Sequence, residues 1–294
     1  MLEHSIHQIQ PYLFQIGNFQ LRYYGLMYVL GFVFFLIFMR RQIKLNKVDL
    51  TNNEFDSLFT WLIIALLIGG RLGYVLFYNF GHYLQHPLEI IWPFRDGKLV
   101  GFSGMSFHGG LLGCIVGGWL WTRKNKKNFF EIGGLVVTVA PLGLFFGRLG
   151  NFLNGELWGR VSDVKWAMYF PGEAGLSFDT PLNIIRQYIE SGYIQARHPS
   201  QIYEALTEGL LLFLIMLWLH KKNAAGSVRI GVLLIGYAVF RTFCEFFRQP
   251  DPQLGFLFGW VTMGQLLSFF MVLGGIALIV YHFKIEKKKG QGQG

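Results

Sequence analysis

The chain has 294 residues, of which 52% are hydrophobic, 17% aromatic and only 15% charged. About a quarter of the residues in an average soluble protein are charged. The composition therefore excludes a disordered chain and does not fit an ordinary soluble enzyme. The formal net charge of +9 does not indicate nucleic-acid binding, because the basic residues flank apolar stretches and form no separate domain.

Seven apolar stretches are long enough to cross a bilayer, which takes about 20 residues of helix. They are apolar on all sides rather than on one face, which is typical of membrane spans. In chain order the predicted spans are 23–39, 58–80, 101–122, 129–153, 202–219, 228–247 and 256–283. We therefore predict an all-α polytopic membrane protein with seven transmembrane helices, in a single integral membrane domain covering residues 1–294.

The basic residues predict the orientation of these spans. Fifteen of the 26 Lys and Arg residues lie at alternate span ends, in clusters at 40–47, 123–127, 221–229 and 284–289. Because Lys and Arg concentrate on the cytoplasmic side, we expect the N-terminus outside and the C-terminus inside. Residues 1–22 lack the basic region of a cleaved signal peptide, so the first stretch is expected to be a retained span.

Two outer segments are longer than simple connections need. One covers about residues 79–100 and the other about 155–200. The second is rich in aromatic residues and proline, which predicts a small folded head. The length of these outer segments indicates that the functional site faces the outer side of the membrane.

Ionisable residues inside membrane spans are costly, and they are candidates for a functional site. The predicted spans contain Arg71, His108, Arg148, Glu204, Glu208, Arg241 and Glu245, with Asn151 and Gln265 as neutral companions. With the predicted topology, every one of these charges lies in the outer half of its span. Arginines at this depth predict an anion site, because guanidinium pairs bidentately with phosphate.

Structural roles are the alternative for these residues. The charges could form buried ion pairs that only hold helices together, and this alternative is strongest for Arg71. A single histidine in a span is more often structural than catalytic. For His108, the neighbouring Gly109 and Gly110 favour a function, because we expect them to leave open space beside the ring. The sequence contains no metal-binding motif, no P-loop, no dinucleotide fingerprint and no nucleophile elbow.

Two classes of function remain on this reading of the residues. One is an enzyme that acts on the anionic head group of a phospholipid from the outer leaflet, with histidine as the proton acceptor. The other is an anion transporter or channel, which favours charges along a whole path, broken helices and repeats. The inner halves of the predicted spans carry almost no charge, and this favours the enzyme.

Five segments resemble the bacterial prolipoprotein diacylglyceryl transferase family, and they follow one another in the family's order. They are RYYGLMY at 22–28, GMSFHGG at 104–110, GRLGNFLNGELWGR at 147–160, RHPSQIYE at 197–204 and FRTFCEFFRQPD at 240–251. The third segment is the longest and the most specific. The similarity covers nearly the whole chain.

The resemblance implies a transferase that takes part in lipoprotein biosynthesis. Such enzymes move the diacylglyceryl group of phosphatidylglycerol to the lipobox cysteine thiol of a prolipoprotein signal peptide, releasing glycerol phosphate. This is the first step of bacterial lipoprotein maturation. The implied location is the cell inner (cytoplasmic) membrane, with a periplasmic loop at about 79–100, a periplasmic head at about 155–200 and the active site toward the periplasm. The implied partners are these two substrates and membrane lipids, with no cofactor, metal or nucleic acid.

The resemblance and the chemistry together assign roles to site residues. His108 is the expected base for the thiol, and Arg148 and Arg241 are expected to hold the phosphate as its charge grows. Glu156 and Glu245 are expected to orient guanidinium groups. The residues expected to bind glycerol or phosphate oxygens are Tyr24, Asn151, Asn154 and Tyr237.

Overall fold

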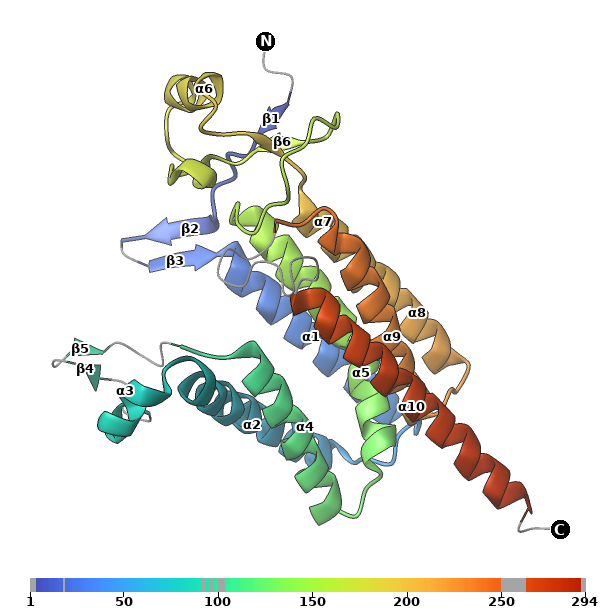
Figure 1. Cartoon of the computed structure of the whole chain (residues 1–294). Helices are drawn as coiled ribbons and strands as arrows, with labels where there is room; N and C mark the ends of the chain where they lie inside the picture. The colour runs from blue at the N-terminus through green and yellow to red at the C-terminus, as the bar shows by residue number, and fades with distance from the viewer. Residues whose placement is uncertain are drawn as a thin grey trace. The chain divides into compact units, whose positions relative to one another are not determined.

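The computed structural model describes residues 4–17, 19–90, 94–95, 98–99, 104–249 and 263–291, and this part of the chain is mostly helical (Figure 1). It divides into two compact units. Unit 1 comprises Met1–Met39 and Gly134–Gly294, and unit 2 comprises Arg40–Gly133. Residues 101–103 and 256–262 of two predicted spans lie outside the described residues.

Unit 2 is built around the two long helices α2 (Asn52–Tyr78) and α4 (Phe107–Lys124). Helix α1 (Tyr23–Lys44) ends in this unit, and α5 (Phe129–Leu153) begins in it. The elements between them are α2 (Asn52–Tyr78), α3 (Phe80–Gln85), the 3-10 helix η1 (Pro87–Ile90), β4 (Phe94–Arg95), β5 (Lys98–Leu99) and α4 (Phe107–Lys124). The two short strands pair in an antiparallel hairpin.

Unit 1 holds most of α1, most of α5 and the C-terminal helices. Its N-terminal strands are β1 (Ser5–Ile6), β2 (Tyr12–Ile16) and β3 (Phe19–Arg22). After α5 come β6 (Met168–Tyr169), the 3-10 helix η2 (Pro171–Ala174), α6 (Leu182–Glu190) and β7 (Ala196–Arg197). The remaining helices are α7 (Ser200–Glu204), the π-helix η3 (Ala205–Leu211), α8 (Leu212–Lys221), α9 (Gly226–Glu245) and α10 (Met263–Gln291).

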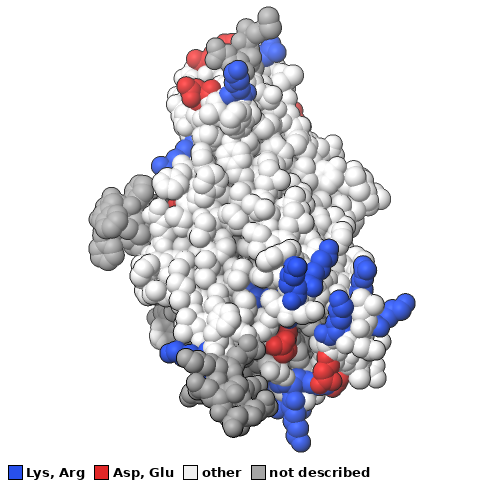
Figure 2. Space-filling model, turned by 90° about the vertical axis from the view of Figure 1, so that its right-hand side faces the viewer, with Lys and Arg blue, Asp and Glu red and all other residues white. Residues whose placement is uncertain are grey.

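Six of these helical segments are long and apolar enough to cross a membrane, among the described residues. They are Tyr23–Lys44, Asn52–Tyr78, Phe129–Leu153, Ser200–Lys221, Gly226–Glu245 and Gly264–Ile285. Many of their large apolar side chains are exposed, and uncharged residues cover most of the face in Figure 2. An apolar surface of this extent does not suit water, and we conclude that the chain is a multi-pass membrane protein.

Helix α4 is the predicted span that is missing from these six. Its 18 residues begin at Phe107 and include His108, Arg123 and Lys124. These polar residues lower the mean hydropathy of a helix that is already short. The prediction had included the apolar residues before the helix, where Gly104–Ser106 form no regular element.

Helix boundaries follow the apolar stretches closely at α5, where 129–153 was predicted and Phe129–Leu153 is found. Helix α2 begins six residues before its predicted span because of a capping box. The Thr51 hydroxyl accepts from the Glu54 amide at 3.2 Å, and the Thr51 amide donates to the Glu54 carboxylate at 2.7 Å. These two bonds satisfy amides that would otherwise lack a partner, so the helix can start in a polar sequence.

Helices α2 and α4 lie side by side (Figure 1) and approach through glycines. A Cβ added at Gly109 would lie 2.4 Å from the Gly69 carbonyl oxygen, and one at Gly113 would lie 2.2 Å from that of Ala65. Small residues allow such backbone contact between membrane helices. The expectation of open space beside His108 was therefore wrong: Gly109 is buried against α2, and Gly110 is also buried, near Leu66.

Residues 154–199 form a small folded segment together with the N-terminal strand. Strand β1 pairs parallel to β6, with Ser5 opposite Met168, and β6 pairs antiparallel to β7. Phe170 and Ile185 are fully buried, and Trp158 stacks on Phe170 with a centroid distance of 5.9 Å. This segment has a small core of its own.

The glycine contact between α2 and α4 can be tested with two alanine substitutions. Gly113→Ala places a Cβ against the Ala65 carbonyl, so the helices must separate, at a cost of about 1–3 kcal/mol for overpacking. Gly110→Ala is the matched control, because its Cβ would lie 3.5 Å from the nearest atom and alanine favours helix. We expect thermal unfolding in detergent to show a lower Tm for Gly113→Ala only. Equal melting temperatures would contradict the close packing.

Candidate active site

Two buried carboxylates form the centre of a charged cluster in unit 1. Glu204 ends α7 and Glu208 lies in η3, and their side chains are 1% and 0% exposed. A buried charge is costly unless it is paired and hydrogen-bonded. The surroundings of these two side chains must therefore supply positive charge.

Three arginines from two other parts of unit 1 supply that charge. Arg148 of α5 approaches Glu204 with a distance of 2.9 Å from Nη2 to Oε2. Arg248, which follows α9, contacts the same oxygen through Nη1 at 3.3 Å. Arg241 of α9 lies 3.8 Å from it. Glu204 therefore ties α5 and the end of α9 to the helix that carries it.

Arg241 makes its shortest contact with a residue of its own helix. Its Nη2 lies 2.8 Å from Oε2 of Glu245, one turn later on α9. Its Nη1 lies 3.9 Å from Glu208 and forms no hydrogen bond in the described part of the chain. Such separations are too long for hydrogen bonds, so a buried donor of Arg241 is left for another oxygen.

A π-helix carries the second acidic residue of the cluster. Segment η3 follows Glu204 directly and includes Glu208 and Gly209. A Cβ on Gly209 would lie 2.6 Å from Cα of Phe145, so the glycine lets η3 approach α5 closely. Short π-helical segments occur frequently at functional sites. Here the segment keeps Glu208 within 4 Å of Arg148 on α5.

A second polar group lies at the end of α5. Oε1 of Glu156 accepts from the amide of Asn151 at 2.8 Å and from that of Asn154 at 3.4 Å. The prediction that Glu156 orients a guanidinium is therefore corrected, because side-chain amides take the place of arginine. The chain turns back here through Gly155, whose φ of +65° favours glycine.

Two predicted tyrosines lie beside these groups. The ring of Tyr24 faces Gly150, where a Cβ would lie 2.9 Å from it, and the Tyr24 hydroxyl lies 3.0 Å from that of Tyr28. Tyr24 is also within interaction range of Asn151 and Glu156. Tyr237 precedes Arg241 by one turn and interacts electrostatically with it.

Two of the singled-out residues belong to unit 2. Arg71 donates to the carbonyl oxygens of Ile90 at 2.8 Å and Glu89 at 2.5 Å, and it lies over the Tyr83 ring. These bonds hold the 3-10 helix η1 against α2, which is a structural role. His108 is exposed at the start of α4, with its ring edge-on to Phe107. The site described here is therefore built from unit 1 alone.

The predicted site omitted three members of the cluster. Glu204 and Glu208 were recognised as charges inside spans, and Arg248 lies in the last of the five matching segments, but none of the three was predicted to bind substrate or to act in catalysis. The signal was present, since Glu204 and Glu208 lie four residues apart in an apolar stretch. Their common partner is visible only once α5, α7 and α9 are packed.

Next to the cluster, an aromatic group fixes the start of α7. Trp166 donates to the Tyr203 hydroxyl at 2.6 Å, and His198 Nδ1 lies 3.1 Å from the same oxygen. Burial lowers the pKa of His198, so its ring is neutral at neutral pH. Tyr203 is thus anchored from the 154–199 segment, immediately before Glu204.

The cluster is suited to binding an anion. Arg148, Arg241 and Arg248 meet at one place, and guanidinium binds phosphate with planar, bidentate geometry. Among the residues that the structure describes, no three His, Cys, Asp or Glu side chains are arranged to hold a metal ion.

Comparisons with known proteins agree with this chemistry. The model of the prolipoprotein diacylglyceryl transferase family matches residues 11–281. A phosphatidylglycerol–prolipoprotein diacylglyceryl transferase of Pseudoalteromonas translucida is 43% identical over 282 residues, covering 96% of each chain. That of Photorhabdus laumondii is also 43% identical, with 96% of each chain covered, and that of Aliivibrio salmonicida is 44% identical over 94% of this chain and 88% of its own. The chain belongs to the prolipoprotein diacylglyceryl transferase family.

Proposed function

We propose that the chain transfers the diacylglyceryl group of phosphatidylglycerol to the cysteine thiol of a prolipoprotein signal peptide. The sulfur attacks the glyceryl carbon, the bond from that carbon to the phosphate oxygen breaks, and a thioether forms. Glycerol phosphate leaves with the electron pair, and the thiol proton passes to a base. The names of the relatives support this reaction.

The observation that carries the proposal is the buried donor of Arg241. Its Nη1 has no hydrogen-bond partner among the described residues, although two carboxylates lie within 4 Å. A phosphate oxygen would fill that position, close to Arg148, which lies 2.9 Å from the same Glu204 oxygen. Charge develops on the phosphate as it leaves, and fixed guanidinium groups stabilise that charge.

The neighbouring residues supply further contacts in this proposal. Glu245 orients Arg241. Asn151, Asn154 and Tyr24 lie at the end of α5, where they are placed to bind glycerol or phosphate oxygens. Glu156 holds the two asparagine amides in position, and Tyr237 lies one turn from Arg241. His108 remains the proposed base, an assignment that rests on the resemblance and on its exposed ring.

We also propose the complete topology. Helix α4 is the seventh span, the N-terminus lies outside and the C-terminus inside, and residues 1–294 form one integral membrane domain. The segments at about 79–100 and 155–200 are then periplasmic, and the membrane is the bacterial inner membrane. The distribution of basic residues and the family membership support this arrangement.

The function is tested with purified protein, phosphatidylglycerol and a lipobox peptide. We expect Arg148→Lys and Arg241→Lys each to lower turnover at least about tenfold, which is at least about 1.4 kcal/mol of transition-state stabilisation. Lysine keeps the charge but loses the planar fork. Arg71→Lys is the matched control, and its effect should be smaller, because Arg71 binds backbone carbonyls.

The same assay includes two substrate controls. Phosphatidylethanolamine in place of phosphatidylglycerol, or a peptide with alanine in place of cysteine, should give no product. Near-normal turnover in both lysine variants would leave the arginines a purely structural role. Anion uptake by proteoliposomes without any lipid transfer would favour a transporter.

The base is tested with His108→Asn, which keeps hydrogen-bonding capacity but cannot accept the proton. We expect transfer to fall about 100-fold, the scale of general-base catalysis, while phosphatidylglycerol still binds. Raising the pH should restore part of the loss, because a free thiol ionises unaided near pH 8.5. Lost lipid binding with an unchanged pH profile would mean that His108 is a lipid or structural ligand.

The topology is tested with single cysteines in a chain whose two native cysteines are replaced by alanine. Ser191 lies in the 154–199 segment, Lys222 lies between α8 and α9, and both residues are exposed. The two variants are Ser191→Cys and Lys222→Cys. A membrane-impermeant maleimide should label position 191 on intact spheroplasts and position 222 only after permeabilisation. Labelling of both from the same side would contradict the seven-span arrangement.

A further inference from the structure

The start of the 154–199 segment has two residues in the left-handed backbone conformation. Gly155 has a φ of +65°, and Leu157 has a φ of +58°. Glycine adopts this conformation readily, whereas it costs a residue with a Cβ about 1–2 kcal/mol. A leucine persists there only where its surroundings fix the backbone. Glu156 lies between the two, so the direction of its carboxylate depends on the contacts that hold this stretch.

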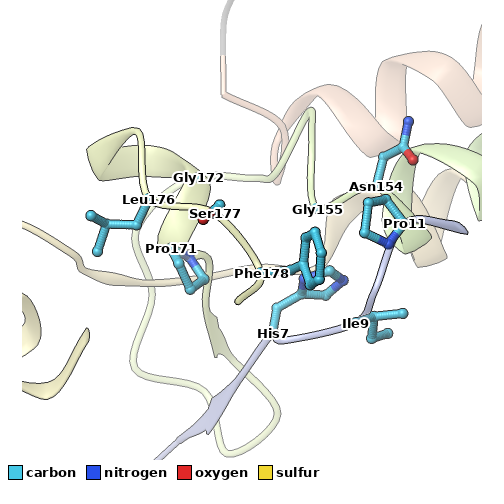
Figure 3. A pocket seen from close by; sticks show the side chains of 10 residues that line it. All are labelled: His7, Ile9, Pro11, Asn154, Gly155, Pro171, Gly172, Leu176, Ser177 and Phe178. Carbon is cyan, nitrogen blue, oxygen red and sulfur yellow. The ribbon is translucent and has the colours of Figure 1, made fainter. Parts of the chain in front are cut away.

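On one side, the turn at Gly155 is held by packing. Gly155 and Asn154 lie with His7 on the wall of a pocket of about 190 Å³ (Figure 3). A Cβ added at Gly155 would lie 3.0 Å from Cε1 and Nδ1 of His7. His7 is itself only 6% exposed and stacked on Phe170. This packing fixes the turn on the side of the N-terminal segment.

On the other side, the first turn of α7 holds the same stretch through hydrogen bonds. Nε2 of Gln201 donates to the carbonyl oxygen of Glu156 at 2.7 Å, and Oγ of Ser200 donates to that of Leu157 at 3.4 Å. Both donor side chains are fully buried. The bond from Gln201 is the shorter of the two. It holds the residue whose carboxylate accepts from the two asparagine amides at the end of α5.

Gln201 also connects the two polar groups of the site. It precedes Glu204 by three residues in α7, which is about one turn of helix. Glu204 is the centre of the arginine cluster. The same short helix therefore carries the carboxylate that pairs with the arginines and the amide that holds Glu156. One element sets the position of Glu156 relative to the arginines.

Stability alone does not explain a glutamine at this position. Oε1 of Gln201 is buried and has no hydrogen-bond partner among the described residues. An unsatisfied buried polar atom costs about 1–3 kcal/mol. This cost offsets much of what the bond from Nε2 contributes. What the side chain provides is a fixed position for Glu156.

We propose that Gln201 is a positioning residue for the transfer. Its hydrogen bond holds the backbone of Glu156, and through it the carboxylate that orients Asn151 and Asn154 for binding phosphatidylglycerol. The proposal rests on the transferase function proposed above. It gives Gln201 no contact with either substrate and no part in proton transfer. Loss of the bond should therefore weaken lipid binding and leave the use of the acceptor peptide unaffected.

Kinetics with Gln201→Met test this role. Methionine keeps the length of the side chain but donates no hydrogen bond. It removes the unpaired Oε1 and leaves the Glu156 carbonyl without its donor, so we expect a Tm within about 2 °C of the unsubstituted chain. The KM for phosphatidylglycerol should rise about tenfold, the scale of one lost hydrogen bond. We expect kcat and the KM for the lipobox peptide to stay within about twofold.

Two further variants complete this experiment. Gln201→Asn keeps an amide that is one methylene too short to reach Glu156, and it should raise the same KM. Gln8→Met is the matched control, because Gln8 makes the same kind of bond, from Nε2 to the Thr180 carbonyl at 3.0 Å, and this carbonyl belongs to neither polar group of the site. A lower Tm with both KM values raised would make Gln201 a structural residue and overturn the proposal. An unchanged KM for phosphatidylglycerol in both Gln201 variants would overturn it as well.

A double-mutant cycle shows whether Gln201 acts through Glu156. Glu156→Ala removes the carboxylate that Gln201 is proposed to position. Once it is absent, adding Gln201→Met should raise the KM for phosphatidylglycerol by less than about twofold, because coupled residues are not additive. Multiplication of the two separate effects would mean that Gln201 acts independently of Glu156, against the proposal.

Equilibrium binding of phosphatidylglycerol to the purified chain separates this proposal from the transferase function, because it needs no turnover. We expect Gln201→Met to weaken binding about tenfold and Gln8→Met to leave it unchanged. If binding shows this dependence but no lipidated peptide forms, the positioning role is retained and the transferase function is rejected. Normal transfer with equal affinity in the two methionine variants would overturn the positioning role alone.

Discussion

The carboxylate of Glu204 is the constraint on which the rest of unit 1 depends. It is almost completely buried in an apolar bundle, and transfer of an isolated charge from water into such surroundings is very costly. Arg148, Arg241 and Arg248 lie within 4 Å of it. Because these arginines come from α5, from α9 and from the residues after α9, one acidic group fixes the register of several helices. A shift of any helix by one turn, about 5.4 Å, would leave a charge without its partner.

Stability alone does not account for such a cluster. Buried ion pairs often contribute little compared with apolar residues of the same size. The useful property here is that the arginines are held in place while Nη1 of Arg241 has no hydrogen-bond partner among the described residues. Each guanidinium has five N–H donors, so Arg241 can pair with Glu245 and still offer Nη1 to a phosphate oxygen. In the proposed function, the carboxylates hold the arginines where the leaving phosphate would bind.

The sequence predicts the parts of this structure that depend on local patterns. The apolar run at 129–153 was enough to place α5, and the in-span charges at 148, 204, 208, 241 and 245 pointed to the residues of the cluster. Which side chains contact one another was harder to predict from the sequence. Glu156 was expected to orient a guanidinium group, yet after the turn at Gly155 its carboxylate accepts from Asn151.

Features that depend on packing between distant segments could not be predicted. Gly109 and Gly110 were read as empty space, because a sequence does not show that another helix fills the place of a missing side chain. The π-helix η3 has no recognisable pattern in the apolar stretch that contains it. The pocket around His7 joins residues 7–11 to residues 154–178, and no periodicity links two segments so far apart in the chain.

The 154–199 segment is hydrogen-bonded to the end of α9. Arg160 donates through Nε to the carbonyl of Arg248 at 2.9 Å and through Nη2 to that of Glu245 at 3.3 Å. The backbone amide of Arg160 also donates to the Phe247 carbonyl at 2.8 Å. The same segment lines the pocket, so the end of α9 and the pocket wall are parts of one hydrogen-bonded frame. Catalysis that joins two substrates requires their reacting atoms to be held in one geometry, and these hydrogen bonds hold the end of α9, close to Arg241, in a fixed position.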